Sequence, residues 1–218
     1  MMYNKENLLN HIQKVKPEGF GLLKDSFGYV SSDVEQKVIY LATREYFPHG
    51  AYIFGASAHI TFNEIENKLK PLYLAQGVKN SDVYTIKNSL VNIEGVDYNL
   101  LDQEIDDDNS FARISGELKK LIDAALLFFD KLNTIEDVAN FLADKEPKEI
   151  VPFIQGTILF PKTILILEFA DHPKFEEKRD EFYELLKKQA TKRKQTEVDL
   201  RVFEKLFIKR DGVAALSW

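Results

Sequence analysis

The sequence predicts an α+β protein, with an antiparallel sheet in the N-terminal half packed by helices and a helical C-terminal half. Two observations carry this prediction. Residues 36–60 hold two strand-like runs, rich in β-branched and aromatic residues, that a short loop separates. From residue 109 onward, apolar side chains recur instead at helical spacing. No linker-like segment interrupts the chain, so we expect one domain, 1–218, sheet-rich over about 1–100 and helical over about 109–210.

The N-terminal elements follow from apolar patterns and from the residues that interrupt them. Residues 4–16 predict an amphipathic helix that ends before a proline and a glycine. Residues 20–30 predict a short hairpin. Residues 36–46 and 51–60 predict two strands, and the short connection between them predicts that they pair antiparallel.

The strand predicted at residues 51–60 alternates with period two, which assigns its side chains to two faces. The more apolar face is expected to meet the core. It consists of Tyr52, Phe54, Ala56, Ala58 and Ile60. The opposite face carries Ile53, Gly55, Ser57 and His59, and its small residues suggest that a helix packs closely against it.

The middle of the chain predicts a helix, one or two strands and a loop. Residues 61–64 resemble a capping box, so a helix is expected to run to about residue 69, where Pro71 ends or kinks it. Residues 81–93 have strand-like composition. Residues 94–108 are expected to form a solvated acidic loop.

The strongest helical pattern lies in residues 109–144. Ser110 is a suitable N-cap, and apolar residues follow it at helical spacing as far as Phe129. A break at residues 130–133 precedes a second helix, for which Thr134 and Asp137 form a capping box. We therefore predict a helical hairpin that serves as a scaffold.

The remaining residues predict mainly helices. Residues 150–160 are apolar and β-branched, which leaves helix and strand open, whereas residues 163–169 favour a helix that starts near Pro161. Residues 174–189 and 197–209 each carry an apolar stripe at helical spacing and predict two more helices.

Composition and motifs argue against several functional classes. The chain has no cysteine, so it offers neither disulfides nor thiolate ligands, and its start lacks the pattern of a signal peptide. The longest apolar run, 157–170, is too short and too interrupted to span a membrane. The four histidines show no metal-ligand spacing, and no glycine-rich phosphate loop follows a strand. We therefore expect a cytoplasmic protein with no metal, no cofactor and no membrane partner.

The net charge of −6 is unevenly distributed. One segment, residues 94–108, contains seven acids and no base, and it is called the acidic segment below. Its acids are Glu94, Asp97, Asp102, Glu104, Asp106, Asp107 and Asp108. We predict that these acids bind a partner protein. A basic partner is expected, because opposite charges attract. The basic segment, 187–194, carries Lys187, Lys188, Lys192, Arg193 and Lys194, and offers an alternative function in nucleic-acid binding.

Catalytic motifs are incomplete in this sequence. The acidic segment does not match a calcium-binding EF-hand, because Asp107 and Arg113 occupy the positions of the required glycine and glutamate. The run around Ser57 lacks the second glycine of a nucleophile elbow, where His59 stands. A small-molecule or enzyme site near Ser57, His59 and Arg44 is nevertheless kept as an alternative.

The order of elements resembles that of the bacterial domain of unknown function 4304 family. The resemblance rests on the opening helix before Gly19-Phe20, on the paired strands containing 37–41 and 51–54, and on residues 127–132. The family often has a proline ahead of the two aromatic residues, where this chain has Leu127. The resemblance implies no catalytic residues. It implies a role like that of proteins that neutralise toxins.

Together these observations favour a non-enzymatic protein that binds another protein, as a toxin-neutralising immunity protein does. The expected partner is a basic toxin domain, and the acidic segment is the expected contact surface.

Overall fold

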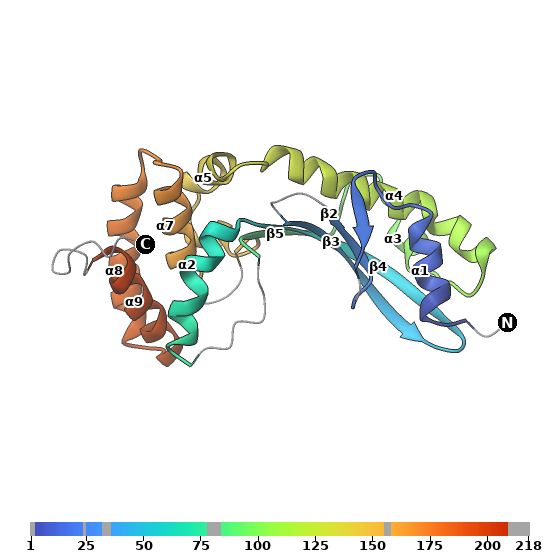
Figure 1. Ribbon diagram of the computed structural model, residues 1–218, viewed down its shortest axis with the longest axis horizontal. Helices are drawn as coiled ribbons and strands as arrows, with labels where there is room; N and C mark the ends of the chain where they lie inside the picture. Colours follow the sequence, from blue (N-terminus) through green and yellow to red (C-terminus); the bar gives the residue numbers. More distant parts are fainter. Residues whose placement is uncertain (1–2, 24, 32–35, 78–83, 155–157, 209–218) are drawn as a thin grey trace. The chain divides into compact units, whose positions relative to one another are not determined.

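The computed structural model describes residues 3–23, 25–31, 36–77, 84–154 and 158–208 (Figure 1). The chain forms two compact units. Unit 1 comprises Met1–Thr61 and Lys87–Lys131, and unit 2 comprises Phe62–Ile86 and Leu132–Trp218. The sheet lies in the N-terminal half and most helices follow it, which confirms the predicted α+β class. The expected single domain stays a prediction.

Within the described residues, the sheet has five strands in the order β1-β2-β3-β4-β5. They are β1 (Phe20–Leu22), β2 (Gly28–Ser31), β3 (Gln36–Tyr46), β4 (Gly50–Thr61) and β5 (Ile86–Leu90). The first four strands pair antiparallel with their neighbours in the chain, which confirms the hairpin and the strand pair that the sequence predicts. Residues 81–83 of the strand segment predicted at 81–93 lie outside the described residues.

A β-bulge in β4 makes part of the predicted face assignment wrong. Ala42 on β3 pairs with Gly55, but the next residue, Thr43, pairs with Ile53, so Phe54 is an extra residue. The alternation therefore reverses at this point. Ala56, Ala58 and Ile60 are buried as expected, and so are Ala51 and Ile53, whereas Tyr52 is only partly buried and Phe54 is 43% exposed.

Helices of unit 1 cover the inner face of the sheet, which carries Ile39 and Ala58. Leu8 and Ile12 of α1 (Lys5–Gln13) are buried, and the hydroxyl of Tyr29, the neighbour of Ile39 on β2, donates to the carbonyl of Ile12. The long helix α4 (Asp108–Lys131) packs on β3 and β4 through a buried apolar stripe. The short helix α3 (Tyr98–Leu101) precedes α4 in the chain.

The outer face of β3 and β4 carries Tyr40, Ser57 and His59. Ser57 and His59 are half-buried and Tyr40 is 39% exposed. The outer face of β4 is therefore more exposed than it would be if a helix packed closely against it, as the sequence suggests.

The two helices predicted within residues 109–144 are confirmed as α4 and α5 (Ile135–Ala143), but Ser110 is not the N-cap, because α4 begins at Asp108. Thr134 and Asp137 form the expected capping box. Near the end of α4, Ala125, Phe128 and Phe129 are buried, whereas Leu127 is 69% exposed. The helices belong to different units, because unit 1 ends at Lys131.

Unit 2 is built from helices around α7, whose residues 161–167 are all buried. The helices are α2 (Asn63–Leu74), α5, α6 (Pro147–Ile150), α7 (Leu159–Phe169), α8 (Phe175–Ala190) and α9 (Lys194–Phe207). α7 packs against α2, α5, α6, α8 and α9. The helices predicted near the C-terminus are thus confirmed. Residues 155–157 of the ambiguous stretch and residue 209 of the last predicted helix lie outside the described residues.

Helix α2 differs from its prediction at both ends. Its N-cap is Phe62, with no side-chain hydrogen bond, because Thr61 still belongs to β4. Pro71 does not end the helix, because α2 continues to Leu74.

A buried polar cluster joins α2 to α7 inside unit 2. The ammonium of Lys162 lies 2.7 Å from Glu66 Oε1 and donates to the carbonyl of Tyr84 at 2.6 Å. The hydroxyl of Thr85 donates to the same Glu66 oxygen at 3.0 Å. Lys162 and Glu66 are both almost fully buried, so each charge depends on the other for compensation.

A second buried polar contact joins α2 to α9. The hydroxyl of Tyr73 donates to Asp199 Oδ1 at 3.1 Å. Asp199 is 3% exposed and Tyr73 is fully buried. Burial raises the pKa of Asp199 to about 7, although the hydrogen bond from Tyr73 acts in the opposite direction.

Candidate functional site

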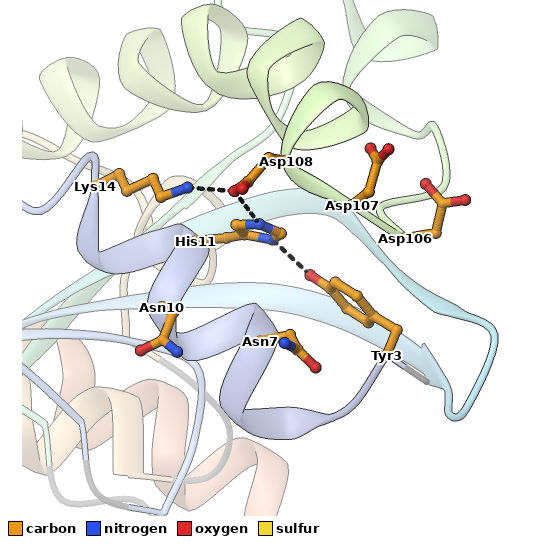
Figure 2. Close-up of a pocket in the computed structure, with 8 residues that line it drawn as sticks. All are labelled: Tyr3, Asn7, Asn10, His11, Lys14, Asp106, Asp107 and Asp108. Atoms are coloured by element: carbon orange, nitrogen blue, oxygen red, sulfur yellow. Dashed lines mark hydrogen bonds and ion pairs between the residues drawn. The ribbon is translucent and has the colours of Figure 1, made fainter. Parts of the chain in front are cut away.

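Unit 1 contains a surface cavity of about 400 Å³ between the start of the chain and the start of α4 (Figure 2). The residues that line it are Tyr3, Asn7, Asn10, His11, Lys14, Asp106, Asp107 and Asp108. The three aspartates belong to the predicted acidic segment. No sequence pattern places the other five beside them, because they lie in residues 3–14, about a hundred positions earlier in the chain.

A chain of hydrogen bonds runs through the cavity wall. The hydroxyl of Tyr3 lies 2.8 Å from His11 Nδ1, and His11 Nε2 lies 3.0 Å from Asp108 Oδ1. The ammonium of Lys14 also pairs with Asp108. The ring of His11 stacks on Phe111, with centroids 4.8 Å apart. Because a carboxylate can only accept, Nε2 donates to Asp108 and, in the neutral ring, Nδ1 accepts from Tyr3.

The contacts of His11 and Lys14 with Asp108 join the α1 segment to the start of α4. Burial, followed by the charges of Asp106 and Asp108, raises the pKa of Tyr3 above its ordinary value. The hydrogen bonds from Lys14 and then from His11 lower the pKa of Asp108. With its pKa raised, the Tyr3 phenol stays protonated near neutral pH. In Figure 2 the carboxylates of Asp106 and Asp107 point away from the imidazole.

Three acids of the acidic segment serve the local fold. Asp97 caps α3 by accepting from two backbone amides. Asp107 accepts a hydrogen bond from the backbone N–H of Ser110, and this bond lowers the pKa of Asp107. Asp108 pairs with Lys14, as described above. The helix dipole favours acids near a helix start, where Asp107 and Asp108 lie, but no sequence pattern reveals Lys14 as a partner.

The other four acids of the segment lie on its surface. All seven acids are exposed. Within the described part of the chain, no ion pair involves Glu94, Asp102, Glu104 or Asp106. The segment is nevertheless fixed in place, because Ala51 on β4 and Ile105 exchange two backbone hydrogen bonds of 3.0 and 2.8 Å.

The structure brings together two of the three residues of the alternative site on the sheet. Ser57 Oγ lies 2.9 Å from His59 Nε2, and the ring of His59 meets the edge of Tyr40. Arg44 lies four residues further along β3 than Tyr40, or roughly 13 Å away. Its guanidinium lies over the ring of Phe54 instead. The cavity described above is lined by other residues.

The basic segment occupies the end of α8 and the turn that follows. Lys187 pairs with Glu184 and lies over the ring of Tyr183 at 4.5 Å, and the hydrogen bond to Glu184 raises the pKa of Lys187. The side chains of Lys188, Lys192 and Arg193 are exposed. Part of the positive charge is thus compensated within the same helix.

The described residues show neither a cluster that could hold a metal ion nor a helix that could span a membrane. No three or more histidine, aspartate or glutamate side chains in that part of the chain are placed to hold a metal ion. No helix in the described ranges combines the length and apolarity that a membrane crossing requires.

Comparison of the chain with protein-family models, with curated proteins and with solved structures finds no match. The resemblance to the domain of unknown function 4304 family therefore stays a prediction.

Proposed function

We propose that this protein acts without catalysis and binds a basic protein through its acidic segment, as a toxin-neutralising immunity protein does. The observation that supports the proposal is the fixed yet uncompensated surface of that segment. Backbone pairing at Ile105 and the cap at Asp97 hold it in one conformation, while Glu94, Asp102 and Asp106 present carboxylates to solvent.

A preformed charged surface favours association in two ways. Like charges held close together produce a negative potential that speeds the approach of a basic partner. Because the segment is already ordered, binding does not have to fix a flexible loop, which would oppose association. Neither effect requires a reaction at the surface.

The test is capture of the partner by a charge-reversed variant. Asp107 and Asp108 are left unchanged, because their carboxylates hold Ser110 and Lys14. The variant carries Glu94→Lys, Asp102→Lys and Asp106→Lys. A basic protein recovered from the native host by the unchanged chain should be lost with this variant.

A matched control changes the net charge equally at another place. Asp123, Asp130 and Glu177 are exposed and belong to no ion pair of the described residues, so their replacement by lysine should leave capture intact. Loss of the partner with both variants would show that only net charge matters and would contradict the proposal. If the partner is a toxin, its expression without this protein should arrest cell growth.

A further inference from the structure

Two tyrosines form an aromatic corner at the tip of the β3–β4 hairpin. Tyr46 ends β3 and lies opposite Gly50, the first residue of β4, while Tyr52 lies opposite Arg44. The rings of Tyr46 and Tyr52 are 5.7 Å apart at 89°. Tyr46 is 50% exposed, which is far more than packing of the hairpin requires.

A carboxylate completes this corner. The pairing of Ala51 with Ile105 brings Glu104 alongside the start of β4. A Cβ atom on Gly50 would lie 2.8 Å from Glu104 Oε1, so the carboxylate occupies the space that a side chain would take there. Desolvation and then the charge of Glu104 raise the pKa of Tyr52, which agrees with a carboxylate close to its hydroxyl.

The corner has the chemistry of a cation site. The faces of aromatic rings attract cations, and a neighbouring carboxylate strengthens that attraction. No ion pair among the described residues includes Glu104. Arg44, the neighbour of Tyr52 across the strands, lies 5.5 Å from the ring of Phe54 instead.

We propose that Tyr46, Tyr52 and Glu104 bind one arginine or lysine side chain of the basic partner. The cation lies against the aromatic corner on one side and against the carboxylate on the other. This inference rests on the proposed function, because it assumes a basic protein partner, and it names the contact that such a partner makes. The site lies within unit 1 and uses only exposed or half-buried side chains, so its occupation needs no rearrangement of the core.

The test uses short peptides as probes of the full-length chain. Capped Gly-Arg-Gly and Gly-Lys-Gly are titrated into the isotope-labelled protein, and amide shifts are followed by NMR. A capped Gly-citrulline-Gly peptide, which has the shape of arginine but no charge, is the control. The arginine peptide should shift the amides of Tyr46, Gly50, Tyr52 and Ile105, and the citrulline peptide should not.

Three variants separate the contributions of the ring and the charge. Tyr46→Leu and Glu104→Gln should each weaken the binding of the arginine peptide roughly two- to fivefold. Tyr46→Phe keeps the aromatic face and should bind like the unchanged chain. Each of the replaced side chains is exposed, so the fold should survive.

The outcomes distinguish this site from the proposed function. Equal binding of citrulline, or full binding by Tyr46→Leu, would overturn the aromatic corner. If the partner is still captured by Tyr46→Leu and Glu104→Gln but lost when Glu94, Asp102 and Asp106 are reversed, the corner is refuted and the proposed function stands. If capture survives that reversal while the corner variants lose the peptide, the proposed function fails and the corner remains.

Discussion

Replacement of Asp199 by asparagine should remove a large part of the pH dependence of folding stability. In the folded chain, burial between α9 and α2 raises the pKa of Asp199 to about 7, compared with 3.8 for an ordinary aspartate. The folded state therefore binds a proton more tightly than the unfolded state. The stabilisation from this proton is complete below about pH 4 and is lost as the pH rises through 7.

The magnitude follows from the difference between the two pKa values. Each pH unit between them is worth about 1.4 kcal/mol, so ionisation of Asp199 should lower the free energy of unfolding by about 3 kcal/mol between pH 5 and pH 8.5. Asparagine stays neutral over that range, and its carbonyl can still accept the hydrogen bond from Tyr73. The difference in unfolding free energy between the variant and the unchanged chain should therefore shift by about 3 kcal/mol in favour of the variant from pH 5 to pH 8.5.

Urea unfolding followed by circular dichroism at several pH values measures this effect. The relevant quantity is the difference in unfolding free energy between the two proteins, because other titrating groups cancel in it. Asp123→Asn, at an exposed position on α4, is the control and should show no dependence of this kind. A difference that stays constant from pH 5 to pH 8.5 would refute the argument that Asp199 is held in its neutral form.

Two glycine substitutions and two changes in the buried ion pair test other parts of the fold. Gly28→Ala should destabilise by roughly 3–5 kcal/mol or prevent folding, because φ is +146° and the added Cβ would lie 2.0 Å from the carbonyl oxygen of Ile39. Gly116→Ala, in the exposed interior of α4 with nothing within 4 Å of the new Cβ, should stabilise by roughly 0.5–1 kcal/mol, and thermal unfolding of both glycine variants checks the contrast. Glu66→Gln should destabilise by roughly 3 kcal/mol, because it leaves the buried Lys162 ammonium without a counter-charge, and Lys162→Met in addition should recover most of the loss in urea unfolding. No recovery in the double variant would contradict the pairing argument.

Elements with strong local signals could be predicted from the sequence. The apolar spacing after Ser110 and the Thr134–Asp137 capping box correctly located α4 and α5, because each signal depends on neighbours within a few residues. The bulge at Phe54 could not be predicted in this way. It depends on how β4 pairs with β3, which period-two alternation does not encode.

The candidate site was only partly predictable. The sequence identified the acidic segment, but the contact between His11 and Asp108 joins residues 97 positions apart, and no local pattern reveals such a partner. The Tyr46–Tyr52 corner was hidden for a related reason, because the alternation of β4 assigns Tyr52 to the buried face. Asp199 lies beside Val198 on a helix with an apolar stripe, and only the packing of α2 shows that its carboxyl is buried.

The bulge at Phe54 changes which residues of β4 face inward, from odd-numbered positions before it to even-numbered positions after it. Towards the base of the hairpin, Ala56 and Ala58 face the helices; towards the tip, Ala51 and Ile53 do so. If Phe54 instead paired regularly with Thr43, the tip would be turned over, with the ring of Tyr52 in the interior and Ile53 in water. A bulge at a single position can thus keep an aromatic surface exposed at one end of a sheet while the apolar interior stays intact, and selection could adjust the tip for recognition independently of the base.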